Sequence, residues 1–384
     1  MIPYSSHTID ESDIAAVSDA LRRAMLSPGP DLTRFESTVA EYCGARFAVA
    51  FSSGTAALHA AVHAAGGREG DSGITSPLSF IASANCMVYA GMRPYFCDIE
   101  PLTMNMDPAA LATALRSDTK IVIPVHYAGV PCDMERIAAL ARTRNTTVIE
   151  DGAHALGALT QNGPVGNCAF SDMACFSLHP LKSITTGEGG LVTTNQPVLH
   201  ERLTLFRSHG LVRNANNRFP DEGPWYMEMQ DLGFNYRMNN FQAALGLSQL
   251  QKIESFISRR EDIHRRYDQA FSALPGVIVP HIPEKIRSAH HLYVVRFDNA
   301  VIHADRREIV ESLRQAGIGT QVHYVPIHLH HFYRTRFDCH AGMFPQAEAA
   351  YASMLSLPLY PKMTDDEIEQ VISGFSDVIR RATQ

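Results

Sequence analysis

Short apolar runs alternate with amphipathic segments through the first half of the chain. Runs of strand length cover residues 48–51, 73–76, 93–97, 121–125, 147–150, 173–176 and 190–193. Helical periodicity covers residues 10–25, 31–43, 54–65, 79–90, 108–116 and 133–143. Because strands and helices alternate, the pattern predicts an α/β fold with a mainly parallel sheet that is covered by helices on both faces.

The first helix is expected to start at a cap formed by Thr8 or Asp10. Its apolar positions Ile14, Val17 and Leu21 lie on one face at helical spacing. That face is expected to pack against the rest of the chain.

The second half of the chain has a different order of elements. A long helix is predicted over residues 239–274, strands at 292–297 and 320–325, and helices at 305–316, 345–355 and 364–381. Residues 206–236 are irregular and mostly polar, which favours a mobile loop over a site. We expect a large domain over residues 1–240 and a smaller α+β domain over residues 241–384, which starts with the long linking helix.

Composition narrows the class of protein. The 384 residues are 45% hydrophobic and 19% charged, and the net charge of -7 gives no support to nucleic-acid binding. The seven cysteines are scattered and form no CxxC pair, which favours reduced thiols and a cytoplasmic location. The first residues lack the basic and apolar regions of a signal peptide, and no apolar stretch approaches the ~20 residues of a membrane span.

Lys182 stands out because its neighbours are small, apolar or hydroxylated, with no acidic residue within five positions on either side. Burial lowers the pKa of a lysine, and the neutral amine can form a Schiff base. Asp151 follows an apolar strand thirty-one residues upstream. Such a pair suits pyridoxal 5'-phosphate (PLP), because the lysine holds the aldehyde and the aspartate keeps the pyridine nitrogen protonated.

A second candidate feature lies at residues 52–55, where a predicted helix opens directly after a strand. The N–H groups and the dipole at such a helix start form an anion site, although an ordinary N-cap is the alternative. Ligands of parallel sheets bind outside the carboxyl ends of the strands. Thr55, Asp151 and Ser177 all follow strands, so these side chains can converge, and we favour a phosphate site at residues 52–55.

Four other side chains have two interpretations each. Phe80 either packs in the core or stacks on a pyridine ring. His154 is either a satisfied polar residue or a hydrogen-bond partner of the cofactor. Ser177 is a buried hydroxyl or a phosphate donor, and Glu188 is a solvated turn charge or part of the site.

Two further patterns suggest sites that we reject. Residues 186–190 read TGEGG, which is not GxGxxG and does not open a helix, so no dinucleotide fingerprint is present. Residues 323–331 are rich in histidine, but no cysteine or carboxylate shares the cluster. We predict no metal site and interpret this run as a loop that faces the substrate.

Three segments carry a resemblance to a known family. Residues 150–157 read EDGAHALG, residues 176–190 contain FSLHPLK and TGEGG, and residues 233–238 read GFNYRM. Together they resemble the DegT/StrS-type sugar aminotransferases, which are PLP enzymes of fold type I, the aspartate aminotransferase fold. Dehydratase relatives carry histidine in place of the lysine, so Lys182 favours transamination. Gly152 departs from the alanine or serine that is more frequent in the family.

The resemblance implies roles for individual residues. Lys182 would bind the cofactor and move the proton, Asp151 would pair with the pyridine nitrogen, and His154 would lie at the polar edge of the ring. The implied phosphate ligands are Gly54, Thr55, Ser177 and, from a neighbouring subunit, Asn235; Phe80 would stack on the ring. Candidates for the substrate side are Glu188, Arg237, His323 and Tyr324. The family thus implies a homodimer with shared sites.

Within the family, further segments resemble the enzymes of pseudaminic acid biosynthesis. These segments are residues 2–4, 75–86, 124–134 and 207–210. The likeness implies a UDP-linked 4-keto sugar as acceptor and L-glutamate as amino donor. Another nucleotide-linked keto sugar is the first alternative, and a non-catalytic regulator with the same fold is the second.

Overall fold

The computed structural model describes residues 1–27, 29–213 and 225–384. Its centre is a seven-stranded sheet of order β1-β9-β8-β5-β4-β2-β3. The strands are β1 (Phe47–Phe51), β2 (Ser72–Thr75), β3 (Arg93–Phe96), β4 (Thr119–Ile123), β5 (Thr147–Asp151), β8 (Met173–Ser177) and β9 (Gly190–Thr194). Neighbouring strands from β8 to β3 are parallel, and β9 runs antiparallel to β8 and β1. The predicted mainly parallel sheet is confirmed.

Helices cover the sheet on both faces, as the alternating pattern predicts. They are α2 (Pro30–Cys43), α3 (Gly54–Ala64), α4 (Ala82–Tyr89), α5 (Pro108–Ala114), α6 (Met134–Arg142) and α7 (Pro197–Arg207). Val49 and Phe51 of β1 enter the core with α3 and α7, whereas Ala48 and Ala50 enter the core with α2. Successive strand residues point to opposite faces, so one strand serves two apolar layers. The sequence pattern did not indicate α7.

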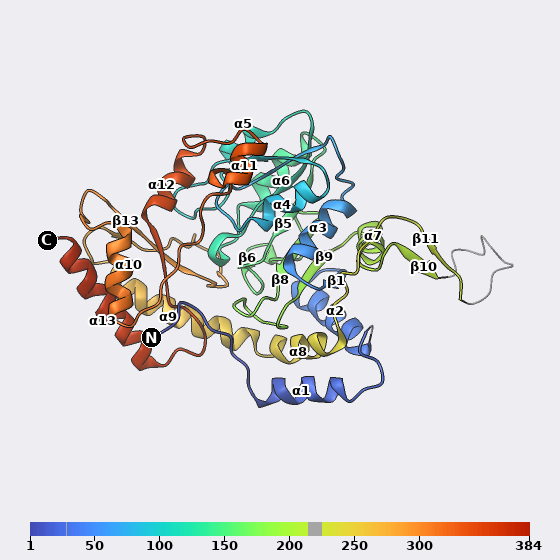
Figure 1. The fold of residues 1–384 in the computed structure, drawn as a ribbon, viewed down its shortest axis with the longest axis horizontal. Coiled ribbons are helices and arrows are strands. Elements are labelled where there is room, and N and C mark those ends of the chain that lie inside the picture. Colours follow the sequence, from blue (N-terminus) through green and yellow to red (C-terminus); the bar gives the residue numbers. More distant parts are fainter. Residues whose placement is uncertain (28, 214–224) are drawn as a thin grey trace.

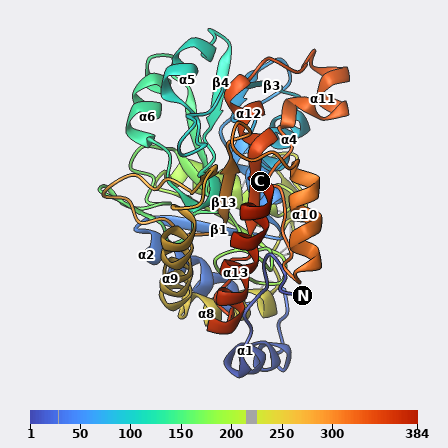
Figure 2. The same ribbon diagram turned by 90° about the vertical axis from the view of Figure 1, so that its left-hand side faces the viewer.

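A further group of elements follows the sheet in the chain. They are α8 (Asn240–Leu250), α9 (Ile253–Phe271), β12 (Val277–Ile278), β13 (Tyr293–Phe297), α10 (Arg306–Gln315), α11 (His331–Arg336), α12 (Pro345–Ser353), β14 (Met354–Leu357) and α13 (Asp365–Ala382). Helices α10 and α13 lie side by side (Figure 2). Helices α9, α10 and α13 and strands β13 and β14 share a core that includes Tyr267, Phe271, Tyr293 and Phe375, whereas α8 packs with α2 in another core. The α+β character is as expected, and the boundary at residue 240 stays a prediction.

Two predictions in this region are wrong. The long helix over residues 239–274 is two helices, because α8 ends before Gln251 and α9 begins after Lys252. Residues 320–325 are not a strand. Gln321 exchanges backbone hydrogen bonds with Ser356, and the chain then leaves the sheet.

The N-terminal helix also differs from its prediction. Helix α1 (Glu11–Leu21) has Asp10 as its cap, but Ile14 and Leu21 are 51% and 52% exposed. The buried side of α1 instead carries Asp13, whose carboxylate accepts hydrogen bonds from Lys252 at 2.7 Å and from Gln249 at 2.8 Å. A buried ion pair therefore fixes α1 on α8, where apolar packing was expected.

A β-hairpin projects from the body of the molecule (Figure 1). It consists of β10 (Leu211–Arg213) and β11 (Met227–Met229), which pair antiparallel. The irregular loop predicted for residues 206–236 is therefore partly wrong, and residues 214–224 of that prediction lie outside the described residues. Smaller elements are the pair β6 (Leu159–Thr160) and β7 (Gly163–Pro164), and the 3-10 turns η1 (Tyr127–Gly129) and η2 (Ile327–Leu329).

Two sequence expectations concern cysteines and membranes. All seven cysteines are free and buried. No helix within residues 1–27, 29–213 and 225–384 has the length and apolar character that a membrane crossing requires.

Phe375→Ala should destabilise the core of the C-terminal elements. The ring is fully buried and lies 4.6 Å from the ring of Phe271, centroid to centroid. Its removal leaves a cavity, for which we expect a loss of about 3–5 kcal/mol in the free energy of unfolding. Urea unfolding measures this loss. As a control, Leu102→Ala, at a side chain that is 54% exposed, should change stability by less than about 0.5 kcal/mol. Equal effects of the two substitutions would contradict the assignment of this core.

Candidate active site

A cavity of about 390 Å³ opens where β5 and β8 end and α3 begins. Residues of the C-terminal elements and of the N-terminal segment complete its wall. The sequence-predicted residues that line it are Gly54, Thr55, Phe80, Asp151, His154, Ser177, Lys182, Glu188, His323 and Tyr324. The tertiary structure therefore brings ten predicted residues together around one space.

The start of α3 forms the most tightly packed part of the cavity wall. Ser53 caps the helix by accepting a hydrogen bond from the N–H of Ala56 at 3.1 Å. A Cβ at Gly54 would lie 2.9 Å from Cβ of Ser177, and one at Gly190 would lie 2.2 Å from the carbonyl oxygen of Ser53. Two positions without a side chain thus let β8 and β9 approach the helix start. The first N–H groups of the helix have no intrahelical partner and can bind an anion beside the Ser177 hydroxyl.

Asp151 ends β5 and is buried at 4% exposure. One carboxylate oxygen accepts a hydrogen bond from the hydroxyl of Ser83 at 2.6 Å, and the other accepts one from the N–H of Ala153 at 3.1 Å. Ser83 also contacts Ser79 through their hydroxyls at 2.6 Å. These two bonds fix the orientation of the carboxylate.

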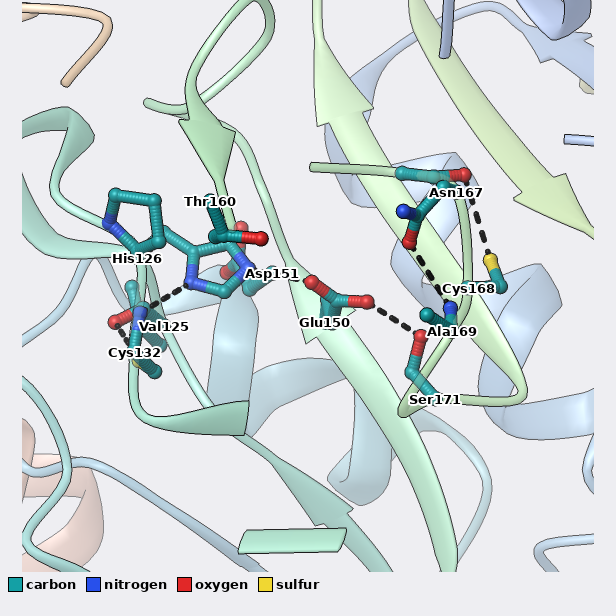
Figure 3. A network of polar contacts seen from close by, with 12 residues as sticks. Val125, His126, Cys132, Glu150, Asp151, Thr160, Asn167, Cys168, Ala169 and Ser171 are labelled. Atoms are coloured by element: carbon teal, nitrogen blue, oxygen red, sulfur yellow. Dashed lines mark hydrogen bonds and ion pairs between the residues drawn. The ribbon is translucent and has the colours of Figure 1, made fainter. Parts of the chain in front are cut away.

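A second layer of polar contacts supports the end of β5 (Figure 3). Glu150 contacts Nε2 of His126 at 2.7 Å and also accepts a hydrogen bond from the hydroxyl of Ser171. Nδ1 of His126 accepts the N–H of Cys132 at 3.0 Å, so the proton lies on Nε2 and is donated to Glu150. The carboxylates of Glu150 and Asp151 face opposite sides of the strand, and the first anchors the strand that presents the second.

Lys182 lies in the turn after β8 and its side chain is only partly enclosed. Burial lowers its pKa to about 8, and the negative charge of Asp151 opposes this shift. No hydrogen bond or ion pair to its amine occurs within residues 1–27, 29–213 and 225–384. A much larger fraction of the amine is therefore neutral at physiological pH than for an ordinary lysine, and this fraction is free to react.

Aromatic and imidazole side chains form the remaining wall. Phe80 is 55% exposed although it lines the cavity, so one face of its ring is free. Core packing, the alternative interpretation of this residue, is therefore excluded. Tyr324 lies 5.9 Å from Phe80, centroid to centroid, and its hydroxyl contacts Nε2 of His154 at 3.1 Å. The sequence did not predict this contact between His154 and Tyr324.

The other substrate-side candidates differ in their surroundings. His323 is buried, and its Nδ1 contacts the hydroxyl of Ser356 at 2.8 Å. Burial, followed by the charge of Lys182, lowers the pKa of His323 to about 4, so the ring is neutral. Glu188 is exposed at the edge of the cavity.

Asn235 and Arg237 do not line the cavity of their own chain. Asn235 is exposed and forms a single antiparallel bridge with Ser208, beside the β10–β11 hairpin. Arg237 is half-buried, and no ion pair to it occurs in the described part of the chain. Both residues keep their polar groups available for a contact outside this chain.

Sequence analysis missed several residues of the site. Ser83 holds Asp151, and the only available signal was the spacing of Ser79 and Ser83 on one helical face. Tyr4, Ser5 and His291 line the cavity without belonging to a recognisable local motif. These three residues become recognisable only when distant segments pack together.

The histidine run holds no metal-ligand group. His328 is buried, and its Nε2 contacts Glu348 at 3.0 Å. Groups of three or more His, Cys, Asp or Glu that could hold a metal ion are absent from the part of the chain that the structure describes. His328 is therefore a packing residue that contacts Glu348. Its ring lies 4.8 Å from that of Phe344, centroid to centroid.

The residues around the cavity fit PLP in each part of that molecule. The start of α3 with Ser177 suits a phosphate, a buried carboxylate suits a protonated pyridine nitrogen, and the free face of Phe80 suits an aromatic ring. The amine of Lys182 suits an aldehyde. All four features belong to the wall of one cavity, so the fit does not depend on a single residue.

Comparison with known proteins also indicates an aminotransferase, and the match covers nearly the whole chain. Residues 7–376 match the model of the DegT/DnrJ/EryC1/StrS aminotransferase family. The spore coat polysaccharide biosynthesis protein SpsC of Bacillus subtilis is 39% identical over 382 residues, which cover 99% of this chain and 98% of that protein.

Solved structures of aminotransferases are similar in fold. Helicobacter pylori PseC, an aminotransferase involved in the biosynthesis of pseudaminic acid, has a TM-score of 0.91 and 32% identity, with 99% of both chains covered. The putative sugar aminotransferase Spr1654 of Streptococcus pneumoniae in its PLP form has a TM-score of 0.92 and 29% identity, with 100% of both chains covered. The chain therefore belongs to the DegT/DnrJ/EryC1/StrS aminotransferase family and is a PLP-dependent sugar aminotransferase of fold type I.

Proposed function

We propose that this enzyme moves an amino group from L-glutamate to C4 of a UDP-linked 4-keto-6-deoxy-N-acetylhexosamine. The product would be UDP-4-amino-4,6-dideoxy-N-acetyl-β-L-altrosamine. The observation that carries the aminotransferase chemistry is the amine of Lys182, with its lowered pKa, beside Asp151 in one cavity. Similarity to PseC over nearly the whole chain supports the choice of sugar.

A different nucleotide-linked keto sugar is the alternative substrate, with a TDP or GDP carrier and amination at C3 or C4. Spr1654 is as similar in fold as PseC, and SpsC is named for spore coat polysaccharide, so the family likeness extends to several sugars. A non-catalytic regulator is disfavoured because Lys182 and Asp151 are both present and face one cavity. A cytoplasmic location also remains a prediction.

The lining of the cavity supports a proposal for the residues that hold the cofactor. Gly54, Thr55 and Ser177 would hold the phosphate, and Asp151 would accept a hydrogen bond from the protonated pyridine nitrogen. Phe80 would cover one face of the ring. Bound PLP supplies an aldehyde and a ring that withdraws electrons from the reacting carbon.

Lys182 has two roles in this proposal. Its Nζ would hold the cofactor, and the same atom would carry a proton between the reacting carbons. Burial brings the pKa of the amine to about 8, so Nζ can both accept and donate that proton near this pH. His154, whose Nε2 contacts the hydroxyl of Tyr324, would contact the polar edge of the ring.

The active unit in this proposal is a homodimer with shared sites. The hairpin region exposes large apolar side chains, among them Trp225 at 77% and Met229 at 61%. Large exposed apolar side chains that gather in one segment are typical of a protein interface. Asn235 adjoins this region and would reach the phosphate in the site of the second subunit, while Arg237 would supply positive charge to its substrates.

A panel of keto sugars tests the substrate. With L-glutamate as donor, the UDP-linked 4-keto sugar should give the highest kcat/KM, and NMR should show the amine at C4 of the product. Lys182→Ala should lower turnover about 10³-fold or more, because both attachment and proton transfer are lost. A TDP or GDP sugar as best substrate would favour the alternative, and full activity of Lys182→Ala would refute the mechanism.

The capture of PLP should depend on pH through the Lys182 amine. Below pH 8 the reactive neutral fraction falls about tenfold per pH unit, and above pH 8 the capture rate should level off. Asp151 raises this pKa, so Asp151→Asn should move the midpoint to lower pH. The absorbance change on mixing apoprotein with PLP measures the rate, and Lys182→Ala gives the background of other amines. A midpoint that does not move would contradict the proposed coupling of these charges.

Complementation between two impaired variants tests the shared site. Asn235→Asp should weaken phosphate binding, because a carboxylate replaces an amide next to an anion. In a heterodimer of Lys182→Ala and Asn235→Asp chains, one site receives both substitutions and the other receives none. Co-expression should therefore restore about a quarter of wild-type activity, since about half the dimers are mixed and each has one intact site. If Asn235 acts within its own chain, no activity returns.

A further inference from the structure

The pair His290–His291 lies just before β13, outside every motif that the sequence indicated. His291 lines the cavity together with Tyr4 and Ser5 of the N-terminal segment, and with His323. Its side chain is 6% exposed. One wall of the cavity consists of residues from the N-terminal segment and the C-terminal elements, namely Tyr4, Ser5, His291 and His323. We call it the neutral wall.

The backbone of His291 is fixed from two directions. Its N–H donates to the carbonyl of Ala128 at 3.0 Å, and its carbonyl accepts from Nη1 of the buried Arg260 at 3.4 Å. A Cβ at Gly129 would lie 3.1 Å from the N atom of His291, so the η1 turn packs directly on this loop. Contacts from the η1 turn and from α9 therefore fix the main chain that carries the His291 imidazole.

The imidazole of His291 has unused hydrogen-bonding capacity. Its ring lies 4.3 Å from that of His154, centroid to centroid, so the two rings pack on each other without a hydrogen bond. Nδ1 is enclosed and has no partner within the described residues, whereas Nε2 also lacks a partner but is not enclosed. Buried polar groups normally have partners, so an unpaired imidazole on a cavity wall points to a ligand.

The neutral wall carries no charge. Burial lowers the pKa of His291 well below its ordinary value, and the neighbouring His154 and Lys182 lower it further. His323 is neutral for the same reasons, and Tyr4 and Ser5 are uncharged near neutral pH. Lys182 is the sole lysine or arginine that lines the cavity in the described part of the chain. A neutral wall of donors and acceptors matches the hydroxyl and carbonyl groups of a hexose better than the two carboxylates of an amino donor.

We propose that Nε2 of His291 hydrogen-bonds the hexose of the sugar nucleotide and so determines productive binding of the acceptor. The proposal rests on the proposed function, because it assigns a residue to the sugar-binding part of the same site. Tyr4 and Ser5 provide further uncharged groups on this wall, and the bridge between Ile2 and Ile318 holds their segment on the C-terminal elements.

His290 provides a matched control for His291. It is equally buried at 6% exposure, and its Nδ1 is also enclosed without a partner within the described residues. Its ring packs on His264 at 4.7 Å, centroid to centroid, and does not line the cavity. A substitution of His290 therefore has a similar structural cost but removes no group from the site.

The two half-reactions of transamination separate the substrates experimentally. In His291→Leu loaded with pyridoxamine phosphate, the aminated form of the cofactor, kcat/KM for the half-reaction with the keto sugar should fall about tenfold, as expected for one lost hydrogen bond. The half-reaction with L-glutamate should stay within about twofold of wild type. Cofactor absorbance follows both reactions. His291→Gln, whose amide nitrogen can replace Nε2, should recover most of the sugar rate, and His290→Leu should change neither rate.

The experiment uses whichever sugar nucleotide of the panel the wild type turns over best. A wild type that aminates none of the sugars refutes the proposed function itself. If the wild type is active and His291→Leu slows both half-reactions equally, or slows neither, the assignment of His291 to the sugar is wrong. It is also wrong if His291→Gln is no better than His291→Leu while both melt at the wild-type temperature.

Discussion

The attraction between the carboxylate of Asp151 and the amine of Lys182 is the interaction on which the site depends. Burial lowers the pKa of the amine, and the carboxylate keeps that shift moderate. The carboxylate is in turn held by Ser83 and by the end of β5, which Glu150 and His126 anchor from the other face. The anchored strand end therefore fixes where the carboxylate lies relative to the amine, and with it how strongly the carboxylate opposes the fall in pKa.

Close packing at the start of α3 imposes the second constraint. Gly54 and Gly190 lack side chains where a Cβ would collide with Ser177 or with the carbonyl of Ser53. The helix start therefore approaches the ends of two strands, and its free N–H groups lie beside the Ser177 hydroxyl. This arrangement concentrates hydrogen-bond donors for an anion while the amine of Lys182 stays on a separate part of the same cavity.

The C-terminal elements and the N-terminal segment contribute groups of a different kind. Their contribution to the cavity is uncharged, because burial keeps His291 and His323 neutral beside Lys182. One chain thus offers a donor-rich anion site, one reactive amine and a neutral wall, but a single lysine or arginine among the described cavity residues. Charged substrates need more positive charge than this, which agrees with the proposal that Arg237 of a second subunit contributes its charge.

The sequence alone determined the alternating sheet and helices, since apolar periodicity records which face each element buries. It also identified Asp151, Ser177 and the start of α3 because they lie at strand ends, and Lys182 because its neighbours in the chain carry no acidic group. It could not place His291, Ser83 or Tyr4, whose roles come from contacts between segments far apart in the chain. It also misjudged α1, where a buried bond from Lys252 to Asp13 decides the packing in place of Ile14 and Leu21. Local patterns encode burial and strand ends, whereas partners across the fold exist only once the chain is packed.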